Sequence, residues 1–228
     1  MNNQVLLDKL SEFLMVEQCG LQLYETVAGR CHTPKLRARY EEFGRQTAKH
    51  REVLVRLITT LGGDPDYVSP TARVVQYKAA KLLESALAVD GLSQAEVECS
   101  DLENVLLAET KDHADWHVLS QLAEQASGDL KKALQAAVSE VEEEEDEHVE
   151  WARETLSQMT LQIVAEGKAP PSERWQSRIT GPEPGIEAFH PAPFTEGLLE
   201  GAAEPVWVET PISRSLEATQ ARRAKATT

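Results

Sequence analysis

The chain has 228 residues, a formal net charge of −15 at pH 7 and a sequence pI near 4.9. This length suits one sizeable core with a short appendage and is too small for two full domains. Nucleic acids and anionic membranes need a basic surface on their protein partners, so the acidic composition excludes both as expected partners. Metal cations are the partners that this charge favours.

We expect neither a membrane span nor an export signal in this sequence. No stretch approaches the roughly 20 apolar residues of a membrane span, and residues 1–4 have neither the basic flank nor the apolar run of a signal peptide. Cys19, Cys31 and Cys99 are widely spaced and form no C-x-x-C motif, so we expect reduced thiols rather than disulfides or a thiolate metal site. We therefore expect a cytoplasmic protein.

Two long helices are predicted at the start of the chain, over residues 5–28 and 34–61. Apolar residues recur in both at three- and four-residue spacing, and a proline at the first position of the second helix suits a helix start. The Gly-Gly-Asp-Pro sequence that follows the second helix predicts its end. Polar residues interrupt both apolar stripes: Glu17 in the first, and Thr47 and His50 in the second.

A shorter helix is predicted from Ser69-Pro70 to residue 89, and its apolar stripe contains no acidic residue or histidine. The third long helix is predicted over residues 93–125. Glu109 and His113 lie on its apolar face, one turn apart.

The fourth long helix is predicted as one continuous element over residues 129–166, and Glu145 and His148 lie inside its apolar stripe. Glu and His three residues apart project from one helical face, so both side chains can bind one metal ion. The surrounding acidic run, residues 142–147, is otherwise interpreted as a solvated face.

An irregular, Pro-rich tail is predicted over residues 167–228, because eight of the eleven prolines lie from Pro170 onward and helical periodicity disappears. The tail also contains four aromatic residues, which are too many for a simple linker. We expect part of it to lie against the helices, a neighbouring subunit or a partner protein, and the chain to form a homo-oligomer. The aromatic residues are Trp175, Phe189, Phe194 and Trp207.

Each of the four long helices thus places a metal-ligand type of residue on a face that should be apolar. A charge on a buried face costs several kcal/mol unless it is paired or bound to a metal, so four such positions in register favour a metal site. A helical core that takes a Glu from each of two helices and a Glu-x-x-His from each of the other two holds a pair of iron or manganese ions. The candidate ligands are Glu17, His50, Glu109, Glu145 and His148.

In this layout, residues 4–166 resemble the ferritin-like superfamily, and most closely its rubrerythrin and bacterioferritin branches. The resemblance implies an all-α, up-down four-helix bundle over residues 1–166, with a crossover helix between the second and third long helices. It also implies two bound iron ions, with manganese as an alternative, that react with dioxygen or peroxide to oxidise iron(II) or a substrate. Glu17 and Glu109 would be terminal or bridging ligands, Glu145 the bridge, and His50 and His148 terminal ligands.

One position departs from the family pattern. Where the family has its second bridging Glu, three residues before His50, this chain has Thr47. His113, one turn beyond Glu109, is the alternative ligand that would replace the missing one. Without such a replacement, we expect the site to bind a single ion.

Other interpretations stay open at this stage. Taken singly, His50 is explained as a hydrogen-bonded core histidine, and Glu17 as a carboxylate that accepts a hydrogen bond from Tyr40 or Tyr24. The chain as a whole is interpreted in three ways: a di-iron oxidase or ferroxidase, a non-catalytic metal-handling protein with a degenerate site, or a structural helical protein that binds a partner.

Overall fold

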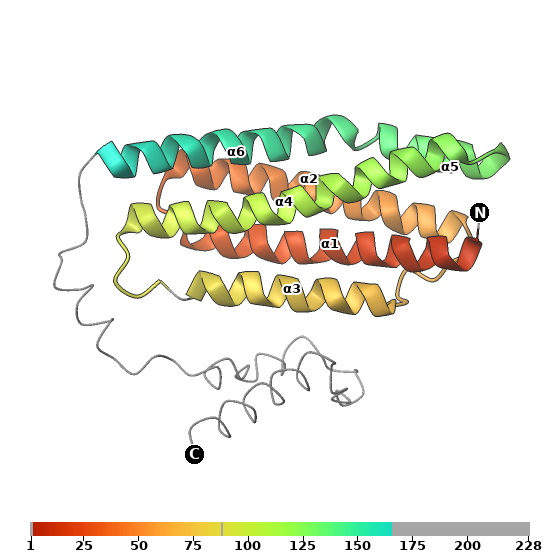
Figure 1. The fold of residues 1–228 in the computed structure, drawn as a ribbon, viewed down its shortest axis with the longest axis horizontal. Coiled ribbons are helices and arrows are strands. Elements are labelled where there is room, and N and C mark those ends of the chain that lie inside the picture. Colours follow the sequence, from red (N-terminus) through yellow and green to blue (C-terminus); the bar gives the residue numbers. More distant parts are fainter. Residues whose placement is uncertain (1, 88, 166–228) are drawn as a thin grey trace, which may run out of the picture. The chain divides into compact units, whose positions relative to one another are not determined.

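A computed structural model describes residues 2–87 and 89–165, and over these residues the protein is all-helical (Figure 1). None of the helices in this part of the chain is long and apolar enough to cross a membrane. The predicted tail and its four aromatic residues lie outside the described residues. The helices are α1 (Asn3–Arg30), α2 (Pro34–Thr60), α3 (Pro70–Leu87), α4 (Gln94–Gln125), α5 (Gly128–Ser139) and α6 (Glu142–Ala165).

The ends of the first helices follow from local sequence signals. The Asn2 side chain accepts hydrogen bonds from the backbone N–H groups of the first turn of α1, and Pro34 occupies the first position of α2. After α2, Gly62 adopts a φ of +78°, which side-chain-bearing residues rarely tolerate. A Cβ atom on Gly63 would lie 2.6 Å from Leu7 Cδ2, so this turn packs tightly against α1. The predicted bounds of α1 and α2 are confirmed within two residues.

Helix α4 is the longest element, with 32 residues, and starts with a capping box. The Ser93 side chain accepts from the Glu96 N–H, and the Glu96 carboxylate accepts from the Ser93 N–H. This reciprocal cap sets the start of the helix that provides Glu109.

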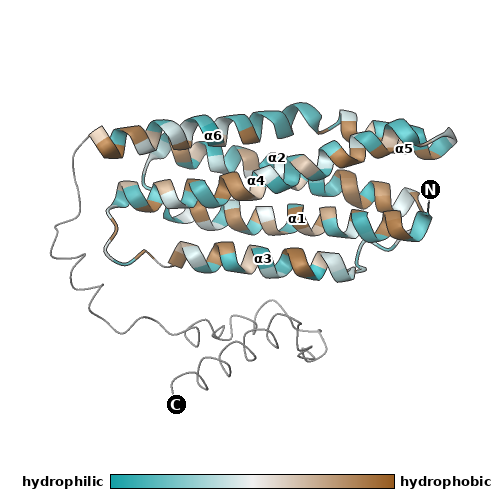
Figure 2. Ribbon diagram, viewed as in Figure 1, coloured by the Kyte–Doolittle hydropathy of each residue, from teal (hydrophilic) through white to brown (hydrophobic). Residues whose placement is uncertain are grey.

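The prediction of one continuous helix over residues 129–166 was wrong, because the structure divides this segment into α5 and α6. At the break, the Glu140 and Val141 N–H groups bond to carbonyls three residues back, which tightens the turn between the two helices. Val141 is buried, and neither Gly nor Pro marks the break in the sequence. The break places the acidic run in the first turn of α6, where Figure 2 shows a hydrophilic stretch of helix.

Helix α1 packs against α2, α3 and α4, and α4 packs against α5 and α6. Figure 1 shows α3 beside α1, on the side away from α6. Two large apolar clusters fill the spaces between these helices. The first contains Leu10, Leu54, Leu119 and Leu134, and the second contains Val27, Phe43, Leu102 and Ala152.

On α1, α2 and α4, the residues of the two apolar clusters are separated by a central band that contains the predicted ligands. On α1 the band lies between Leu14 and Leu23, and on α2 it lies between Phe43 and Val53. The corresponding intervals on α4 and α6 contain the predicted acidic and histidine residues. The fold therefore encloses a polar layer between two apolar layers, where water is excluded from both sides.

Candidate metal centre

Five predicted ligands form the polar layer, and four helices provide them. They are Glu17 from α1, His50 from α2, Glu109 from α4, and Glu145 and His148 from α6; each is at most 3% exposed. This burial places three carboxylates and two imidazoles beyond the reach of bulk water.

The five side chains form two groups that share Glu145. In the first group, His50 Nδ1 lies 2.7 Å from Glu145 Oε1 and 4.0 Å from Glu17 Oε1. In the second group, His148 Nδ1 lies 3.1 Å from Glu109 Oε2 and 3.9 Å from Glu145 Oε1. Within each group the candidate ligand atoms all lie within 4.8 Å of one another. Each group offers two carboxylates and one imidazole, and Glu145 is placed between the two histidines.

Both imidazoles direct Nδ1 into the cluster and Nε2 away from it. His50 Nε2 lies 2.8 Å from Glu144 Oε2, and His148 Nε2 lies 3.0 Å from Gln46 Oε1. Carboxylate and amide oxygens accept hydrogen bonds, so Nε2 of each ring can donate to its outer partner, and Nδ1 can then present a lone pair to the cluster. Metal-binding histidines are oriented in this way by an outer hydrogen-bond acceptor.

Two aromatic donors orient the outer carboxylates. Trp116 Nε1 donates to Glu17 Oε1 at 2.8 Å, and the Tyr24 hydroxyl donates to Glu109 Oε1 at 2.7 Å. The expected alternative, in which Glu17 accepts from Tyr24 or Tyr40, was wrong: Tyr24 bonds to Glu109, and the Tyr40 hydroxyl has no hydrogen-bond partner among the described residues.

Several polar atoms of the cluster have no hydrogen-bond partner within the described part of the chain. They are Glu17 Oε2, both carboxylate oxygens of Glu145, and His50 Nδ1. Buried acceptors without partners carry a desolvation cost of about 1–3 kcal/mol each, and more when charged. All four atoms can bind a cation, so the donor set fits a metal ion.

The pKa values of the cluster also reflect the burial of charged groups without enough partners. Burial, and then the neighbouring carboxylates, raise the pKa of Glu17 and of Glu145 well above the ordinary value for glutamic acid. Burial lowers the pKa of His50 to about 4, although Glu144 opposes this effect. Without a cation, burial therefore disfavours the charged forms of Glu17, Glu145 and His50, and the neutral imidazole is the form that binds metals.

His113 is placed outside both groups. Its side chain is 40% exposed, and Nε2 lies 2.8 Å from Asp146 Oδ1 at the surface. Thr47, by contrast, is buried on α2 one turn before His50, so the position that lacks a carboxylate does face the interior.

Sequence reasoning missed Asp112, which is 5% exposed and lies one turn beyond Glu109 on α4. Burial, and then the Glu145 carboxylate, raise the pKa of Asp112 well above its ordinary value. The sequence signal was Glu109-x-x-Asp112, the same spacing as the Glu-x-x-His pair. The outer acceptors Gln46 and Glu144 carried no comparable signal, because glutamine and glutamate are common on exposed helix faces.

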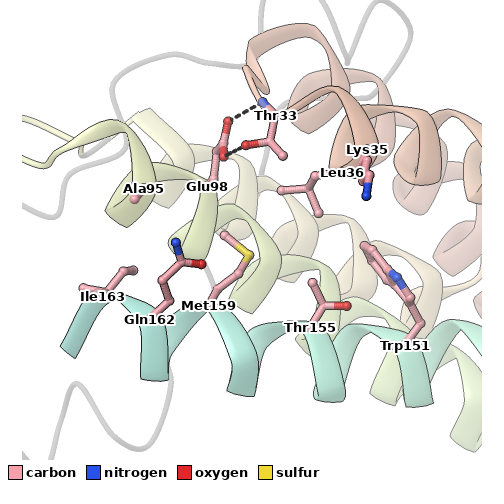
Figure 3. Close-up of a pocket in the computed structure, with 10 residues that line it drawn as sticks. All are labelled: Thr33, Lys35, Leu36, Ala95, Glu98, Trp151, Thr155, Met159, Gln162 and Ile163. Atoms are coloured by element: carbon pink, nitrogen blue, oxygen red, sulfur yellow. Dashed lines mark hydrogen bonds between the residues drawn. The ribbon is translucent and has the colours of Figure 1, made fainter. Parts of the chain in front are cut away.

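Two surface pockets lie away from the cluster. One, of about 340 Å³, lies between the start of α2, the start of α4 and the end of α6 (Figure 3), and one of about 570 Å³ lies between α1, α3 and α4. None of the five cluster residues lines either pocket. Neither pocket therefore brings a large organic molecule into contact with the candidate ligands.

Comparisons with known proteins do not assign the chain to a family. No family model matches it, and neither a curated protein nor a solved structure matches it.

Proposed function

We propose that this protein binds a pair of first-row transition metal ions, one in each of the two groups that share Glu145. The observation that carries this proposal is that Nδ1 of His50 and Nδ1 of His148 lie 2.7 and 3.9 Å from Oε1 of Glu145, a buried carboxylate with no hydrogen-bond partner among the described residues. Each ion would be bound by one histidine, one outer glutamate and Glu145. The outer hydrogen bonds to Nε2 of both rings support this assignment.

We further propose that residues 1–166 form a ferritin-like bundle. Helices α1, α2, α4 and the α5–α6 pair would be its four helices, and α3 the crossover between the second and third. The packing of α1 on α2 and α4, and of α4 on α6, supports this topology. Mixed carboxylate and imidazole ligands suit iron or manganese better than copper, and no thiol belongs to either group.

Iron bound as a pair would supply the electrons that reduce dioxygen or peroxide. The chain itself would hold the ions, keep the site dry between its two apolar clusters, and orient the ligands. The Tyr24 hydroxyl is placed to exchange a proton with Glu109, to which it donates. Because each of the five cluster residues is at most 3% exposed, a small oxidant with iron(II) as the substrate is favoured over oxidation of an organic molecule.

A second candidate function is metal handling without catalysis. Thr47 motivates it, because a threonine at this buried position removes the second bridging carboxylate that the ferritin-like pattern requires. In that case the centre would bind a single ion and would not react with dioxygen.

Metal analysis of the full-length protein tests both candidates. Metal-free protein would be loaded anaerobically with iron(II), desalted and analysed for iron, and oxygen uptake would then be followed. Two ions per chain with oxygen uptake support the oxidase, and one ion without uptake supports metal handling. No bound iron or manganese would contradict both. Glu145→Gln should abolish binding of the pair, whereas Glu147→Gln, at an exposed position of the same helix, should not.

A further inference from the structure

The two ligand groups that share Glu145 differ in how many of their ligand atoms already have a hydrogen-bond partner. In the first group, Glu17 Oε2, His50 Nδ1 and both carboxylate oxygens of Glu145 have no such partner among the described residues. In the second group, His148 Nδ1 and Glu109 Oε2 are hydrogen-bonded to each other at 3.1 Å. A cation can therefore bind the first group without breaking a hydrogen bond, whereas in the second group it must replace one.

The outer partners of the two imidazoles also differ. The partner of His50 Nε2 is the Glu144 carboxylate at 2.8 Å, and the partner of His148 Nε2 is the Gln46 amide oxygen at 3.0 Å. Hydrogen bonds to an ionised acceptor are roughly twice as strong as those to a neutral one. A carboxylate on the outer nitrogen also raises the basicity of a metal-binding imidazole. His50 is therefore the stronger of the two imidazole ligands.

Glu144 supports His50 from outside the cluster. It lies in the first turn of α6, next to the shared ligand Glu145, and its side chain is 28% exposed. Its Oε2 atom contacts His50, and its Oε1 atom accepts a hydrogen bond from Lys49 at 2.9 Å. Neither ligand group contains Glu144. Because each of its oxygens has a partner, Glu144 is placed to orient and polarise the ring rather than to bind an ion itself.

We propose that the His50 position binds the first metal ion, and that Glu144 is the positioning residue that makes this position the tighter one. The inference rests on the proposed function and adds an order of filling to it. The position of Glu109 and His148 receives the second ion, because these two ligands must first separate and the histidine has only an amide as its outer partner. The first ion would stay in place, and iron(II) would exchange as the substrate at the second position.

Titration of the metal-free, full-length protein with manganese(II) tests this inference, because the electron paramagnetic resonance signal of free manganese(II) measures binding without any activity. The wild type should bind two ions in two separate steps. Glu144→Ala should weaken the tighter step by ~10–100-fold, the range seen when the outer partner of a metal ligand is removed. Glu143→Ala is the matched control, since it removes the same charge from an exposed position of the same turn, and it should leave both steps unchanged.

The reciprocal variant should gain affinity. Gln46→Glu gives His148 a carboxylate as its outer partner, so the weaker step should tighten by about tenfold. Damage to the fold does not produce a gain of this kind. His50→Ala should remove the tighter step and His148→Ala the weaker one, which assigns each step to its position.

The outcomes separate this inference from the proposed function. Two steps of equal affinity in the wild type, an unchanged tighter step in Glu144→Ala, or loss of the weaker step in His50→Ala would overturn the order of filling while leaving the metal pair intact. An unchanged weaker step in folded Gln46→Glu protein would overturn the role of the outer charge. No manganese or iron binding in the wild type would overturn the proposed function itself.

Circular dichroism of each metal-free variant verifies that it is folded. If Glu144→Ala does not fold, Glu144→Gln provides the same test, because it keeps the shape of the side chain and removes only its charge. The tighter step should again weaken in this variant, and an unchanged tighter step would overturn the role of Glu144.

Discussion

Buried carboxylates occur in two regions of this molecule, and their surroundings differ. Near the start of α4, Glu98 accepts a hydrogen bond from the His32 N–H. It also accepts hydrogen bonds from the Thr33 N–H and the Thr33 hydroxyl, which Figure 3 shows. Burial raises the pKa of Glu98, but the bonds from Thr33 and His32 outweigh it, and the net pKa is below the ordinary value. In the polar layer, neither carboxylate oxygen of Glu145 has a hydrogen-bond partner among the described residues, and the pKa of Glu145 is raised.

Hydrogen-bond donors, rather than burial itself, decide whether a buried carboxylate is compensated by the protein. Glu98 receives its compensation from the backbone at the α1–α2 junction, so it stabilises the fold without any ligand. Glu17 and Glu145 lack complete compensation from the protein, so they are suited to a cation. Perturbing each region should therefore have opposite consequences for stability and for metal binding.

The largest expected effect is the loss of stability when bound metal is removed. A ligand that binds only the folded state at ~1,000 times its Kd adds about 4 kcal/mol per ion. For a chain of this size, about 2–4 °C per kcal/mol corresponds to a rise in Tm of about 8–16 °C per ion. Differential scanning calorimetry with and without chelator measures the shift. An identical Tm in both conditions would contradict metal binding by the polar layer.

The second-largest expected effect is the loss of stability when the Glu98 carboxylate is removed. Glu98→Ala leaves two backbone N–H groups at the α1–α2 junction without their acceptor, at about 1–3 kcal/mol each, so we expect a loss of about 2–6 kcal/mol in the free energy of unfolding. The loss should be the same with and without metal, because Glu98 is not part of either ligand group. Urea unfolding and metal analysis of the variant measure both quantities. Reduced metal content in the folded variant would link the two regions, against this comparison.

Glu145→Gln should increase, rather than decrease, the free energy of unfolding of the metal-free protein. The substitution keeps the shape of the side chain and removes one buried like charge, so the metal-free form should gain about 1–2 kcal/mol. The same variant should no longer gain stability from added iron or manganese. Chemical unfolding of wild type and variant, each with and without metal, provides the four values needed. A metal-free variant less stable than the wild type would indicate that Glu145 is compensated within the protein.

The stability of the metal-free protein and that of the metal-bound protein should depend on pH in different ways. The pKa values of Glu17, Asp112 and Glu145 are raised in the folded, metal-free protein. Their contribution to its stability is therefore fully present below the unfolded pKa values and is lost as pH rises through the folded pKa values. His50, lowered from 6.5 to about 4, has the opposite effect, and only between those values.

Above pH 6.5, where His50 is neutral in both states, the metal-free protein should therefore become less stable as pH rises. The metal-bound protein should show the reverse slope, because protons compete with the metal for the same ligands. Urea unfolding from pH 6.5 to 8.5 measures both slopes. Equal slopes with and without metal would show that these carboxyl groups do not bind it.

The smallest effect is expected for His113→Ala. This side chain forms only a surface pair with Asp146, and such substitutions usually change stability by less than about 0.5 kcal/mol. Metal stoichiometry should also be unchanged. Loss of an ion in this variant would restore His113 as the substitute ligand that the sequence allowed.

Much of the helical architecture and of the cluster followed from sequence patterns. Proline at the start of α2 and glycine after its end act locally, so the predicted bounds agree with the structure. The positions of Glu17, His50 and Glu145 within apolar stripes also predicted their burial, because a helical stripe has a definite period. The break between α5 and α6 left no such mark, since the apolar period continues through it and Val141 packs into the core beside it.

Spacing along α4 allowed two neighbours of Glu109 to reach the interior, Asp112 three residues on and His113 four residues on. Both spacings lie within one helical face, so the sequence by itself determined only that a polar residue follows Glu109 on that side. The packing of α4 against α1 and α6 decided which one is buried: Asp112 is 5% exposed, and His113 lies at the surface. Periodicity is a property of a single helix and follows from its own residues. The choice of ligands depends instead on how separate helices pack, which no single stretch of sequence determines.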